Sequence, residues 1–280
     1  MRLQCGRFQL DLGRPAVMGV LNVTPDSFSD GGRFLDADAA VAEGERMAAD
    51  GAACIDIGGE STRPGSAPVD ETEELRRVMP VVERLAEWLP IPVSIDTRKP
   101  GVMRRAVAAG ASLVNDVGAL RAPEAVEAVA ASGAAVCLMH MQGEPDTMQD
   151  APVYGDVVAE VRAFLRRRVA ACEASGIART RIAIDPGFGF GKTLEHNLAL
   201  LAGLPALAAD GLPVLVGLSR KRMIGSLTGR SGGERLAGSL AAAVVAVQNG
   251  ARIVRAHDVR ETVDALRVVA ALRAMRDNRA

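Results

Sequence analysis

The chain has 280 residues, of which 49% are hydrophobic and 24% are charged, and its formal net charge is -1 at pH 7. That is enough apolar material for one substantial core, and the length allows one or two domains. A near-neutral chain has no excess of cations to neutralise a phosphate backbone or an anionic membrane, so the composition argues against nucleic acid and membrane partners. Any cationic chemistry must therefore be local.

The cysteines and the opening residues bear on where the protein works. Cys5, Cys54, Cys137 and Cys172 are widely spaced and form no C-x-x-C pair, which favours reduced, buried thiols over disulfides or a metal cluster. The start, MRLQCGRFQLDLGRP, contains no apolar signal-peptide core, and no stretch is long and uncharged enough to span a bilayer. We therefore expect a soluble, cytoplasmic protein.

The first predicted element is a β-hairpin. LQCGRFQLDL alternates polar and apolar residues, as two short paired strands do, and such a hairpin could plug the N-terminal end of a barrel. After it, short β-branched and apolar runs recur, most of them continuously apolar, which is typical of strands covered on both faces. These predicted strands are residues 16–22, 53–58, 92–96, 112–116, 134–139, 181–185, 213–217 and 252–256.

Segments with helical spacing lie between the predicted strands. After residues 53–58, one face of such a segment is apolar, and Pro80 within it predicts a kink or a restart of the helix. Several strands are preceded by a glycine at the expected end of a helix, which is the usual left-handed C-cap and predicts a short turn. The apolar face comprises Leu75, Val78, Met79, Val82, Leu85 and Leu89, and the glycines are Gly51, Gly110, Gly133, Gly211 and Gly250.

The unit of one strand and one helix repeats about eight times, which predicts a (β/α)8 TIM barrel with an N-terminal β-hairpin. No linker or low-complexity segment divides the chain, so we expect a single domain over residues 1–280. The alternative is an open, doubly wound sheet. It accounts less well for the even spacing of the strands and for the absence of a break in composition.

Polar residues gather where the predicted strands end. In a barrel of this type the active site lies at the C-terminal ends of the strands. The opposite turns carry mostly Gly, Ala and Pro, and this asymmetry predicts a functional rim. For any single Asp or Asn, the alternative is a cap for the helix that follows. The residues at the strand exits are Asn22, Asp56, Asp96, Asn115, Asp116, His140, Asp185, Ser219, Arg220, Lys221, Arg255, His257 and Asp258.

Lysines are rare and fall near the same exits. Lys and Arg together number 33, yet the only lysines are Lys99, Lys192 and Lys221, each just after a predicted strand. A compact ammonium in a chain that otherwise uses arginine indicates a functional position, most clearly at Lys221. Lys99, beside Pro100, also suits an exposed residue in the first turn of a helix.

Aromatic residues are scarce as well, and three of them fall in predicted loops. Phe28, Phe188 and Phe190 lie beside polar residues, which suggests a pocket for a flat heterocycle. Packing over the barrel mouth is the alternative.

The segment GFGFGKT follows a predicted strand and precedes a helix, as a nucleotide-binding P-loop does. That motif needs four residues between its first glycine and the Gly-Lys pair, whereas Gly187 to Gly191 leaves three. The spacing argues against a P-loop NTPase. The glycines still allow close approach of the backbone to a ligand.

Taken together, these motifs resemble those of the dihydropteroate synthases of the folate pathway. The resemblance covers almost the whole chain. It implies a (β/α)8 barrel, usually a homodimer, that uses Mg2+ and joins 6-hydroxymethyl-7,8-dihydropterin diphosphate to p-aminobenzoate with release of diphosphate. In chain order the motifs are MGVLNVTPDSFSDGG, DIGGESTRPG, SIDTRKP, NDV, CLMHMQG, DPGFGFGKT, LVGLSRKRMIG and RAHDV.

The resemblance also implies how the pterin is held. A 2-amino-4-oxo pterin offers N–H groups to carboxylates and a carbonyl oxygen to an ammonium such as that of Lys221. Met139 and Phe190 would border the ring, and the guanidinium of Arg255 would stack on its face. The implied pterin-binding residues are Asp96, Asn115, Met139, Asp185, Phe190, Lys221 and Arg255.

Two further residue sets follow from the resemblance. A diphosphate site would comprise Asn22, Arg63, Arg255 and His257, with Mg2+ bridging Asn22 and phosphate oxygens. An aminobenzoate site would comprise Phe28, Thr62, Arg63, Pro64, Phe190, Ser219 and Lys221. The residues expected to carry catalysis are Asp96, Lys221, Arg255 and His257.

The chemistry implied by the resemblance is dissociative: diphosphate departs first, and the arylamine then attacks a pterin methyl cation. The sequence fits, because it offers anion-stabilising residues and no nucleophile triad or covalent cysteine. We hypothesise that anionic Asp96 favours the cation. The loop GGESTRPGS has no inserted residues, which predicts an ordinary sulfonamide-sensitive site; Glu60 in this loop has no assigned chemistry.

Two other functions remain open. A pterin-binding methyltransferase domain shares the pterin carboxylates but has no reason to keep STRPGS, SRK and RAHDV together. A catalytically silent pterin-binding subunit would be favoured by the loss of Arg63, Lys221 or Arg255, and all three are present.

Overall fold

The computed structural model describes residues 1–24, 33–61, 68–144 and 147–277. Each run predicted to be a barrel strand contains one. The strands are β3 (Ala16–Asn22), β4 (Cys54–Gly58), β5 (Val93–Asp96), β6 (Leu113–Asp116), β7 (Ala135–Met139), β8 (Ile182–Asp185), β9 (Leu215–Gly217) and β10 (Ile253–Ala256). The helices are α1 (Arg33–Ala49), α2 (Glu71–Trp88), α3 (Pro100–Ala108), α4 (Ala125–Ala130), α5 (Val157–Ala174), α6 (Leu194–Ala208), α7 (Arg222–Thr228), α8 (Leu236–Gln248) and α9 (Val259–Asp277).

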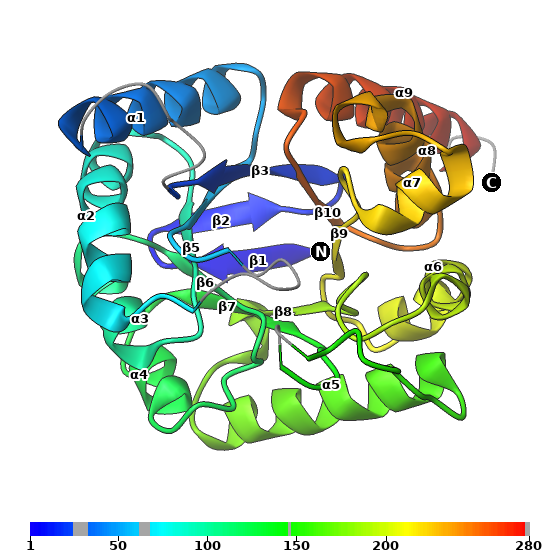
Figure 1. Ribbon diagram of the computed structural model, residues 1–280, viewed down its shortest axis with the longest axis horizontal. Helices are drawn as coiled ribbons and strands as arrows, with labels where there is room; N and C mark the ends of the chain where they lie inside the picture. Colours follow the sequence, from blue (N-terminus) through cyan, green and yellow to red (C-terminus); the bar gives the residue numbers. More distant parts are fainter. Residues whose placement is uncertain (25–32, 62–67, 145–146, 278–280) are drawn as a thin grey trace.

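The barrel strands form one 8-stranded parallel sheet in the order β8-β7-β6-β5-β4-β3-β10-β9. A parallel bridge between Ile184 of β8 and Val214, just before β9, joins the two ends of the sheet. Figure 1 looks along the resulting barrel, with the helices in a ring around the strands. The predicted (β/α)8 fold is confirmed, and the open doubly wound sheet is excluded.

The N-terminal hairpin closes the end of the barrel where the strands begin. Its strands, β1 (Arg2–Cys5) and β2 (Phe8–Asp11), pair antiparallel. Their buried side chains, such as Leu3 and Leu10, pack against Met18, Cys54 and Leu113 inside the barrel. The predicted hairpin plug is confirmed, and apolar side chains fill this end of the barrel.

Helix α2 packs on the barrel through the predicted apolar face, where Val78, Val82 and Leu85 are fully buried. The helix runs unbroken through Pro80, so the predicted restart is wrong. Pro80 lies on the exposed face of the helix. Water can therefore hydrate the carbonyl of Arg76 that the proline leaves without an N–H partner.

The turns that lead into the strands follow the glycine prediction at Gly51, Gly110, Gly211 and Gly250, whose φ angles are 101°, 108°, 76° and 109°. Gly133 is not among the positive-φ glycines, so the prediction is wrong there. The cause is local. The side chain of Ser132 donates to the carbonyl of Val129 at 2.8 Å, which satisfies the end of α4 without a left-handed residue.

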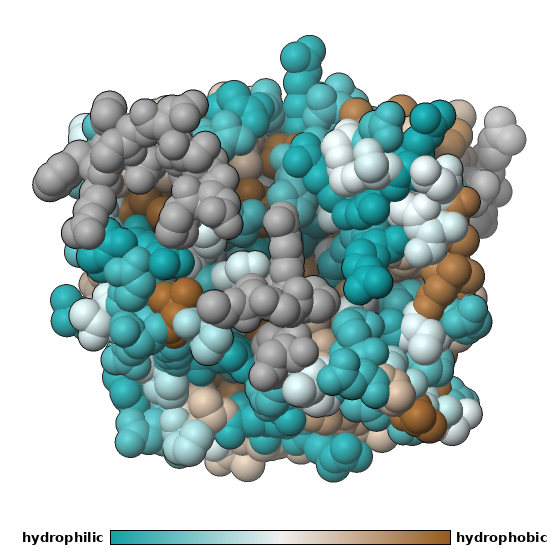
Figure 2. Space-filling view, viewed as in Figure 1, coloured by the Kyte–Doolittle hydropathy of each residue, from teal (hydrophilic) through white to brown (hydrophobic). Residues whose placement is uncertain are grey.

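The four cysteines are free and buried, as predicted. Hydrophilic residues make up most of the face shown in Figure 2. Among the described residues, no helix combines the length and the apolar character needed to cross a bilayer.

Candidate active site

Alternate strand residues point into the barrel, and their character changes along its length. In β4, Ile55 and Ile57 belong to the core between strands and helices, whereas Cys54 packs with the hairpin inside the barrel. The two-residue period of a strand therefore directs Asp56 and Gly58 to the same interior. Interior residues nearer the strand ends are polar: Asn22, Asp56, Ser94, Asp96, Asn115, Asp185 and Arg255.

Arg255 of β10 is the centre of a network that crosses the barrel. Its Nε donates to Asp56 Oδ2 at 2.6 Å, and its Nη2 donates to Asp96 Oδ2 at 2.8 Å. Asn115 Nδ2 also donates to Asp56 Oδ2, at 2.9 Å. We refer to these four residues as the Arg255 network. Asp56, Asp96 and Asn115 lie on the neighbouring strands β4, β5 and β6, whereas Arg255 lies on β10, on the other side of β3. The curvature of the barrel brings Arg255 to the other three.

Burial perturbs the charges of this network. The Asp56 side chain has no exposed surface, and its Oδ1 has no hydrogen-bond partner among the described residues. Burial raises the pKa of Asp96 to about 7; the charge of Arg255 opposes this rise, and the carboxylate of Asp56 adds to it. Burial would lower the pKa of Arg255, but Asp56 and Asp96 outweigh it and raise that pKa. The charge of Asp96 is thus sensitive to pH near neutrality.

Lys221, just before α7, reaches the loop that follows β8. Its Nζ donates to the carbonyl of Phe188 and lies 4.7 Å from the ring centroid of Phe190. Burial lowers the pKa of Lys221 to about 8, and the carboxylate of Asp185 opposes this. Asp185 Oδ1 accepts the backbone N–H of Gly187 at 2.7 Å, and burial raises the pKa of Asp185. An ammonium, an aromatic ring and a carboxylate therefore share this part of the rim.

Phe188 and Phe190 have different surroundings although one residue separates them. Phe188 is fully buried in the main core, so its interpretation as a pocket residue is wrong and the packing alternative holds for it. Phe190 is partly buried and packs with a small cluster that contains Met139. Gly187 and Gly189 have φ angles of 70° and 81°, which turn the backbone between these two directions.

Asn22 and His257 line a cleft of about 430 Å³ between α1 and the start of α9. Ser219 Oγ accepts the backbone N–H of His257 at 3.2 Å and lies 3.1 Å from Nδ1 of its ring. The cleft adjoins the Arg255 network at Gly58. A side chain at Gly58 would lie 3.6 Å from Asp96 Cβ and 4.0 Å from Asn22 Oδ1.

The chain matches the family model described as "Pterin binding enzyme" over residues 18–257. It is 52% identical over 279 residues to the dihydropteroate synthase of Escherichia coli K12, an alignment that covers 100% of this chain and 99% of that protein. Two solved structures are similar. The Xanthomonas albilineans dihydropteroate synthase with 4-aminobenzoic acid matches at a TM-score of 0.92 and 57% identity, over 98% of each chain. The Yersinia pestis dihydropteroate synthase with a sulfonamide drug matches at 0.93 and 51%, over 98% of this chain and 100% of that one.

The chain belongs to the pterin-binding enzyme family. Its relatives within that family are dihydropteroate synthases, and the chain is a transferase of that type.

Several of the predicted rim residues have structural partners. Asp116 accepts the backbone N–H groups of Gly118 and Leu120, so it holds the turn after β6. It does not cap the following helix, α4, whose N-cap residue is Glu124.

Lys192 Nζ lies 2.9 Å from the carbonyl oxygens of Gly187 and Phe190 and 3.0 Å from His140 Nδ1. Burial lowers the pKa of His140 to about 3. Lys192 and His140 therefore hold the loop that carries Phe190.

Some predicted site residues fall in parts of the chain that the structure does not describe, and the sequence assigned no role to Asp56. Phe28, Thr62, Arg63 and Pro64 lie outside the described residues. Asp56 is at a strand exit, but its partners could not be named from the sequence. The alternation in CIDIG, with isoleucines on one face, is the signal that places Asp56 on the interior face with Cys54.

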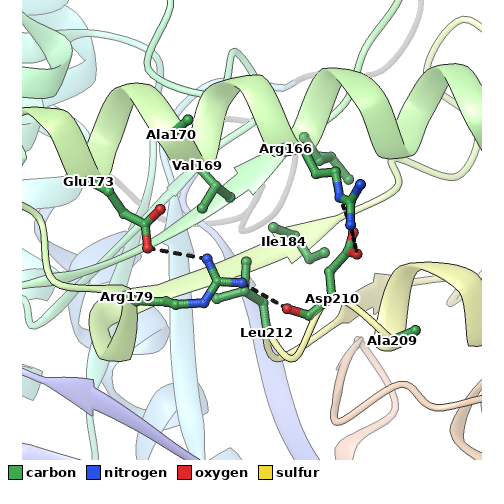
Figure 3. Close-up of a pocket in the computed structure, with 10 residues that line it drawn as sticks. Arg166, Val169, Ala170, Glu173, Arg179, Ile184, Ala209, Asp210 and Leu212 are labelled. Atoms are coloured by element: carbon green, nitrogen blue, oxygen red, sulfur yellow. Dashed lines mark hydrogen bonds and ion pairs between the residues drawn. The ribbon is translucent and has the colours of Figure 1, made fainter.

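A cavity of about 280 Å³ lies at the opposite end of the barrel, between α5 and the turn after α6 (Figure 3). Its charged residues are paired: Arg179 donates to Glu173 at 3.2 Å, and Arg166 donates to Asp210 at 2.8 Å. None of the predicted site residues that the structure describes lines this cavity. The candidate site is therefore the rim at the C-terminal ends of the strands.

Proposed function

We propose that the chain joins 6-hydroxymethyl-7,8-dihydropterin diphosphate to p-aminobenzoate, forms 7,8-dihydropteroate and releases diphosphate. The observation that carries this proposal is the Arg255 network beside Asp185 and Lys221. It offers buried hydrogen-bond acceptors and one ammonium to a flat bicyclic base. The Xanthomonas albilineans relative, whose structure contains 4-aminobenzoic acid, supports the second substrate.

The pterin would be recognised along its polar edge. Because Asn115 Nδ2 donates to Asp56, the Asn115 Oδ1 is directed away from Asp56 and can accept a pterin N–H. Asp96 and Asp185 would accept further N–H groups, and Lys221 would donate to the pterin oxygen and a ring nitrogen. Asp56 orients both Asn115 and Arg255 through one oxygen. Met139 and Phe190 would border the ring, and Arg255 would stack on it.

The diphosphate would lie toward Asn22 and His257, with Arg255 on its other side; Arg63, also predicted here, lies outside the described residues. The described residues contain no group of three His, Cys, Asp or Glu side chains that could hold a metal. The single amide of Asn22 suits Mg2+, which keeps most of its ligands as water and phosphate oxygens. When bound, Mg2+ would neutralise charge on the diphosphate.

The reaction would break the bond between the pterin methylene carbon and the diphosphate oxygen. The electron pair leaves with diphosphate, where Arg255 and His257 compensate its charge. Anionic Asp96 would stabilise the remaining cation, which the arylamine nitrogen attacks before losing its proton. Burial raises the pKa values of Cys54 and Cys137 well above the ordinary range, so neither thiol is a ready nucleophile.

The arylamine would bind beside Phe190, Ser219 and Lys221. Phe28, Thr62, Arg63 and Pro64, also predicted for this subsite, lie outside the described residues. The Yersinia pestis relative was solved with a sulfonamide drug, which supports the prediction that sulfonamides compete with p-aminobenzoate here. Normal folate synthesis at saturating sulfonamide would contradict it.

We further infer that residues 1–280 act as one cytoplasmic pterin-binding domain and that two copies form a homodimer. Exposed apolar side chains support a dimer surface. Val268, Leu272 and Met275 recur on one face of α9, and Val245 is exposed on the adjoining α8. Light scattering on the wild type and on Leu272→Glu tests it, since a monomeric wild type would rule the dimer out.

One assay decides the main proposal. The protein receives the pterin diphosphate and Mg2+, and the release of diphosphate is measured with and without p-aminobenzoate. Dependence on p-aminobenzoate is expected. Pterin binding without release would indicate a silent subunit, and methyl transfer from methyltetrahydrofolate to a corrinoid would indicate a methyltransferase.

A further inference from the structure

The three lysines of the chain differ in what holds their ammonium groups. Lys99 Nζ donates to Glu60 Oε2 at 2.6 Å and to Glu74 Oε2 at 2.5 Å, and 22% of its side chain is exposed. Lys99 is thus a largely buried, ion-paired cation and not an exposed first-turn residue. Lys192 is more deeply buried, with 3% of its surface exposed, and its hydrogen bonds go to neutral groups.

Lys192 binds the loop that follows β8 from its buried side. Its Nζ donates to the carbonyls of Gly187 and Phe190, both at 2.9 Å, and lies 3.0 Å from Nδ1 of His140. Burial lowers the pKa of His140 to about 3, so its ring is neutral near pH 7 and Nδ1 can accept the third ammonium proton. The three N–H groups of Lys192 are therefore used inside the protein and do not face a substrate.

The backbone of this loop explains why such donors are needed. Gly187, Gly189 and Gly191 have φ angles of 70°, 81° and 61°, and these left-handed turns direct the carbonyls away from the partners that a helix or strand would supply. Side chains donate instead. The carbonyls of Gly187 and Phe190 accept from Lys192, that of Phe188 from Lys221, that of Gly189 from Gln149 and that of Gly191 from Tyr154.

The loop lies directly against the backbone that follows β7. A Cβ atom at Gly187 would lie 1.9 Å from the carbonyl oxygen of His140, and one at Gly191 would lie 2.5 Å from that of Gln142. The loop can therefore shift away from β7 but not toward it. Lys192 opposes that shift, because it binds both the loop and His140.

We propose that Lys192 is a positioning residue for the pterin. This rests on the proposed function, in which Phe190 borders the pterin ring and Lys221 donates to the pterin oxygen. Both groups depend on the loop. Phe190 is part of it, and Lys221 Nζ donates to the carbonyl of Phe188 and lies 4.7 Å from the ring centroid of Phe190. Lys192 acts through these two groups and not on the reacting atoms.

The hold of Lys192 on the loop does not require its charge. Burial lowers the pKa of Lys192 to about 7, and the carboxylate of Asp185 opposes this decrease. A neutral amine still donates two hydrogens to the carbonyls of Gly187 and Phe190, and its lone pair can accept from Nδ1 of His140 in the other tautomer. The loop therefore keeps its position over the pH range in which the groups of the rim ionise.

Pterin binding by Lys192 variants tests the proposal. Lys192→Met removes the donors at nearly constant side-chain length and leaves the carbonyls of Gly187 and Phe190 unpaired. The Kd for 6-hydroxymethyl-7,8-dihydropterin, which carries no diphosphate and cannot react, should rise about tenfold by calorimetric titration. Lys192→Gln keeps an amide donor, should raise this Kd about threefold, and carries the same test if Lys192→Met does not fold.

Arg181→Met is the matched control, because Arg181 also donates to backbone carbonyls but lies just before β8, at the other end of the strand. Its Nε donates to the carbonyl of Ala134 at 2.8 Å, and its Nη2 donates to that of Val129 at 2.9 Å. Both Arg181→Met and Lys192→Met should lower the melting temperature by about 2–6 °C. The pterin Kd should rise in Lys192→Met alone.

A double-mutant cycle shows whether Lys192 acts through the aromatic ring of the loop. Phe190→Leu alone should raise the pterin Kd about fivefold. Combined with Lys192→Met, it should raise the Kd about tenfold in total, and not the roughly fiftyfold that two independent effects would give.

The outcomes separate positioning from general stability and from the proposed function. A wild-type pterin Kd in a folded Lys192 variant overturns the proposal, and so does an equal rise in Arg181→Met or a multiplicative cycle. Failure of the proposed function looks different: the wild type would bind the pterin, but diphosphate release would not depend on p-aminobenzoate, and the Kd values of the variants would still differ. A wild type that binds no pterin would overturn both.

Discussion

Two ion-paired aspartates lie at opposite ends of this barrel, and their pKa values move in opposite directions. Asp210, at the N-terminal end, accepts from Arg162 at 2.6 Å and from Arg166 at 2.8 Å, and these hydrogen bonds lower its pKa. Asp96, at the rim, accepts from Arg255 at 2.8 Å, yet burial raises its pKa to about 7. An arginine partner alone therefore does not decide the charge of a carboxylate.

The surroundings of each aspartate decide its charge. Asp210 pairs with Arg162 and Arg166, whose side chains are 32% and 62% exposed, so water solvates part of their charge. Asp96 shares one arginine with Asp56 in a buried network, and the carboxylates of Glu74 and Asp116 raise its pKa further. A surplus of buried acid lowers stability and is kept where it has a use, which favours the rim as the reactive end.

The two aspartates also have opposite effects on stability as pH changes. The folded-state pKa of Asp96 exceeds its ordinary value of 3.8, so the native state retains a proton that the unfolded state loses. Between pH 3.8 and about pH 7, a rise in pH therefore lowers the free energy of unfolding, because the unfolded state gives up the Asp96 proton more readily than the native state does. Asp210 has a lowered pKa, so its stabilisation is present above the ordinary pKa and is lost as pH falls through the folded value.

Replacing Arg255 should have the largest effect. Arg255→Met leaves Asp56 and Asp96 without their cation and removes a group that would compensate departing diphosphate. The value of kcat/KM should fall about 1,000-fold. Steady-state release of diphosphate measures it. Arg166→Met, which removes an exposed arginine at the other end, is the control and should keep wild-type activity. Full activity in Arg255→Met would remove the basis for the rim as the reactive end.

Asp96→Asn should separate turnover from binding. The amide keeps the shape of the side chain but cannot stabilise the methyl cation by charge. The expected result is a fall in kcat of about 100-fold with a change in pterin Kd of less than about fivefold. Single-turnover kinetics and calorimetric titration with a pterin measure the two quantities. Equal losses in both would refute a charge-stabilising role for Asp96.

The sequence predicted the barrel because the signals that define it are local. Continuous apolar runs such as residues 134–139 and 213–217 identify strands covered on both faces, and glycines mark the turns between them. The polar residues at the strand exits could also be listed, because parallel strands that close into a barrel bring these ends to one rim.

Pairings within the rim could not be predicted, because they depend on which side chains meet across the barrel. Asp56 bonds to Asn115 and Arg255 from strands that are not its neighbours. Phe188 and Phe190 look alike in the sequence, but the positive φ angles of Gly187 and Gly189 turn the backbone, so that Phe188 packs in the core and Phe190 lies at the rim. Glu60 had no assigned chemistry because its partner Lys99 lies beyond the next strand.

Asp210→Asn should lower the stability of the protein without lowering its activity. The variant weakens hydrogen bonds to Arg162 and Arg166, and because both arginines are partly exposed the loss is moderated by solvent. The melting temperature should fall by about 2–4 °C with kcat unchanged. Thermal unfolding at pH 7 and at pH 3 measures it, since the difference from wild type should shrink as Asp210 is protonated. A fall in kcat without a change in Tm would instead indicate that Asp210, at the N-terminal end of the barrel, takes part in catalysis.

The smallest and most specific effect is expected from Asp56→Asn. In the wild type, kcat/KM should rise with pH as Asp96 ionises with a pKa of about 7 and fall as Lys221 loses its proton with a pKa of about 8. The charge of Arg255 lowers the pKa of Asp96, and the charges of Asp56, Glu74 and Asp116 raise it. The charge of Asp96 in turn raises the pKa of Lys221. Removing the charge of Asp56 should therefore lower the pKa of Asp96.

The acidic limb of the Asp56→Asn profile should accordingly move to lower pH. The alkaline limb should stay in place, because Asp56 is not among the charges that shift the pKa of Lys221. A purely structural role for Asp56 would lower the rate at every pH and leave both limbs where they are. The pH profile thus tests whether the extra buried carboxylate of Asp56 sets the pH at which Asp96 ionises. Asp210, which pairs with two partly exposed arginines, has no such neighbour in the comparison.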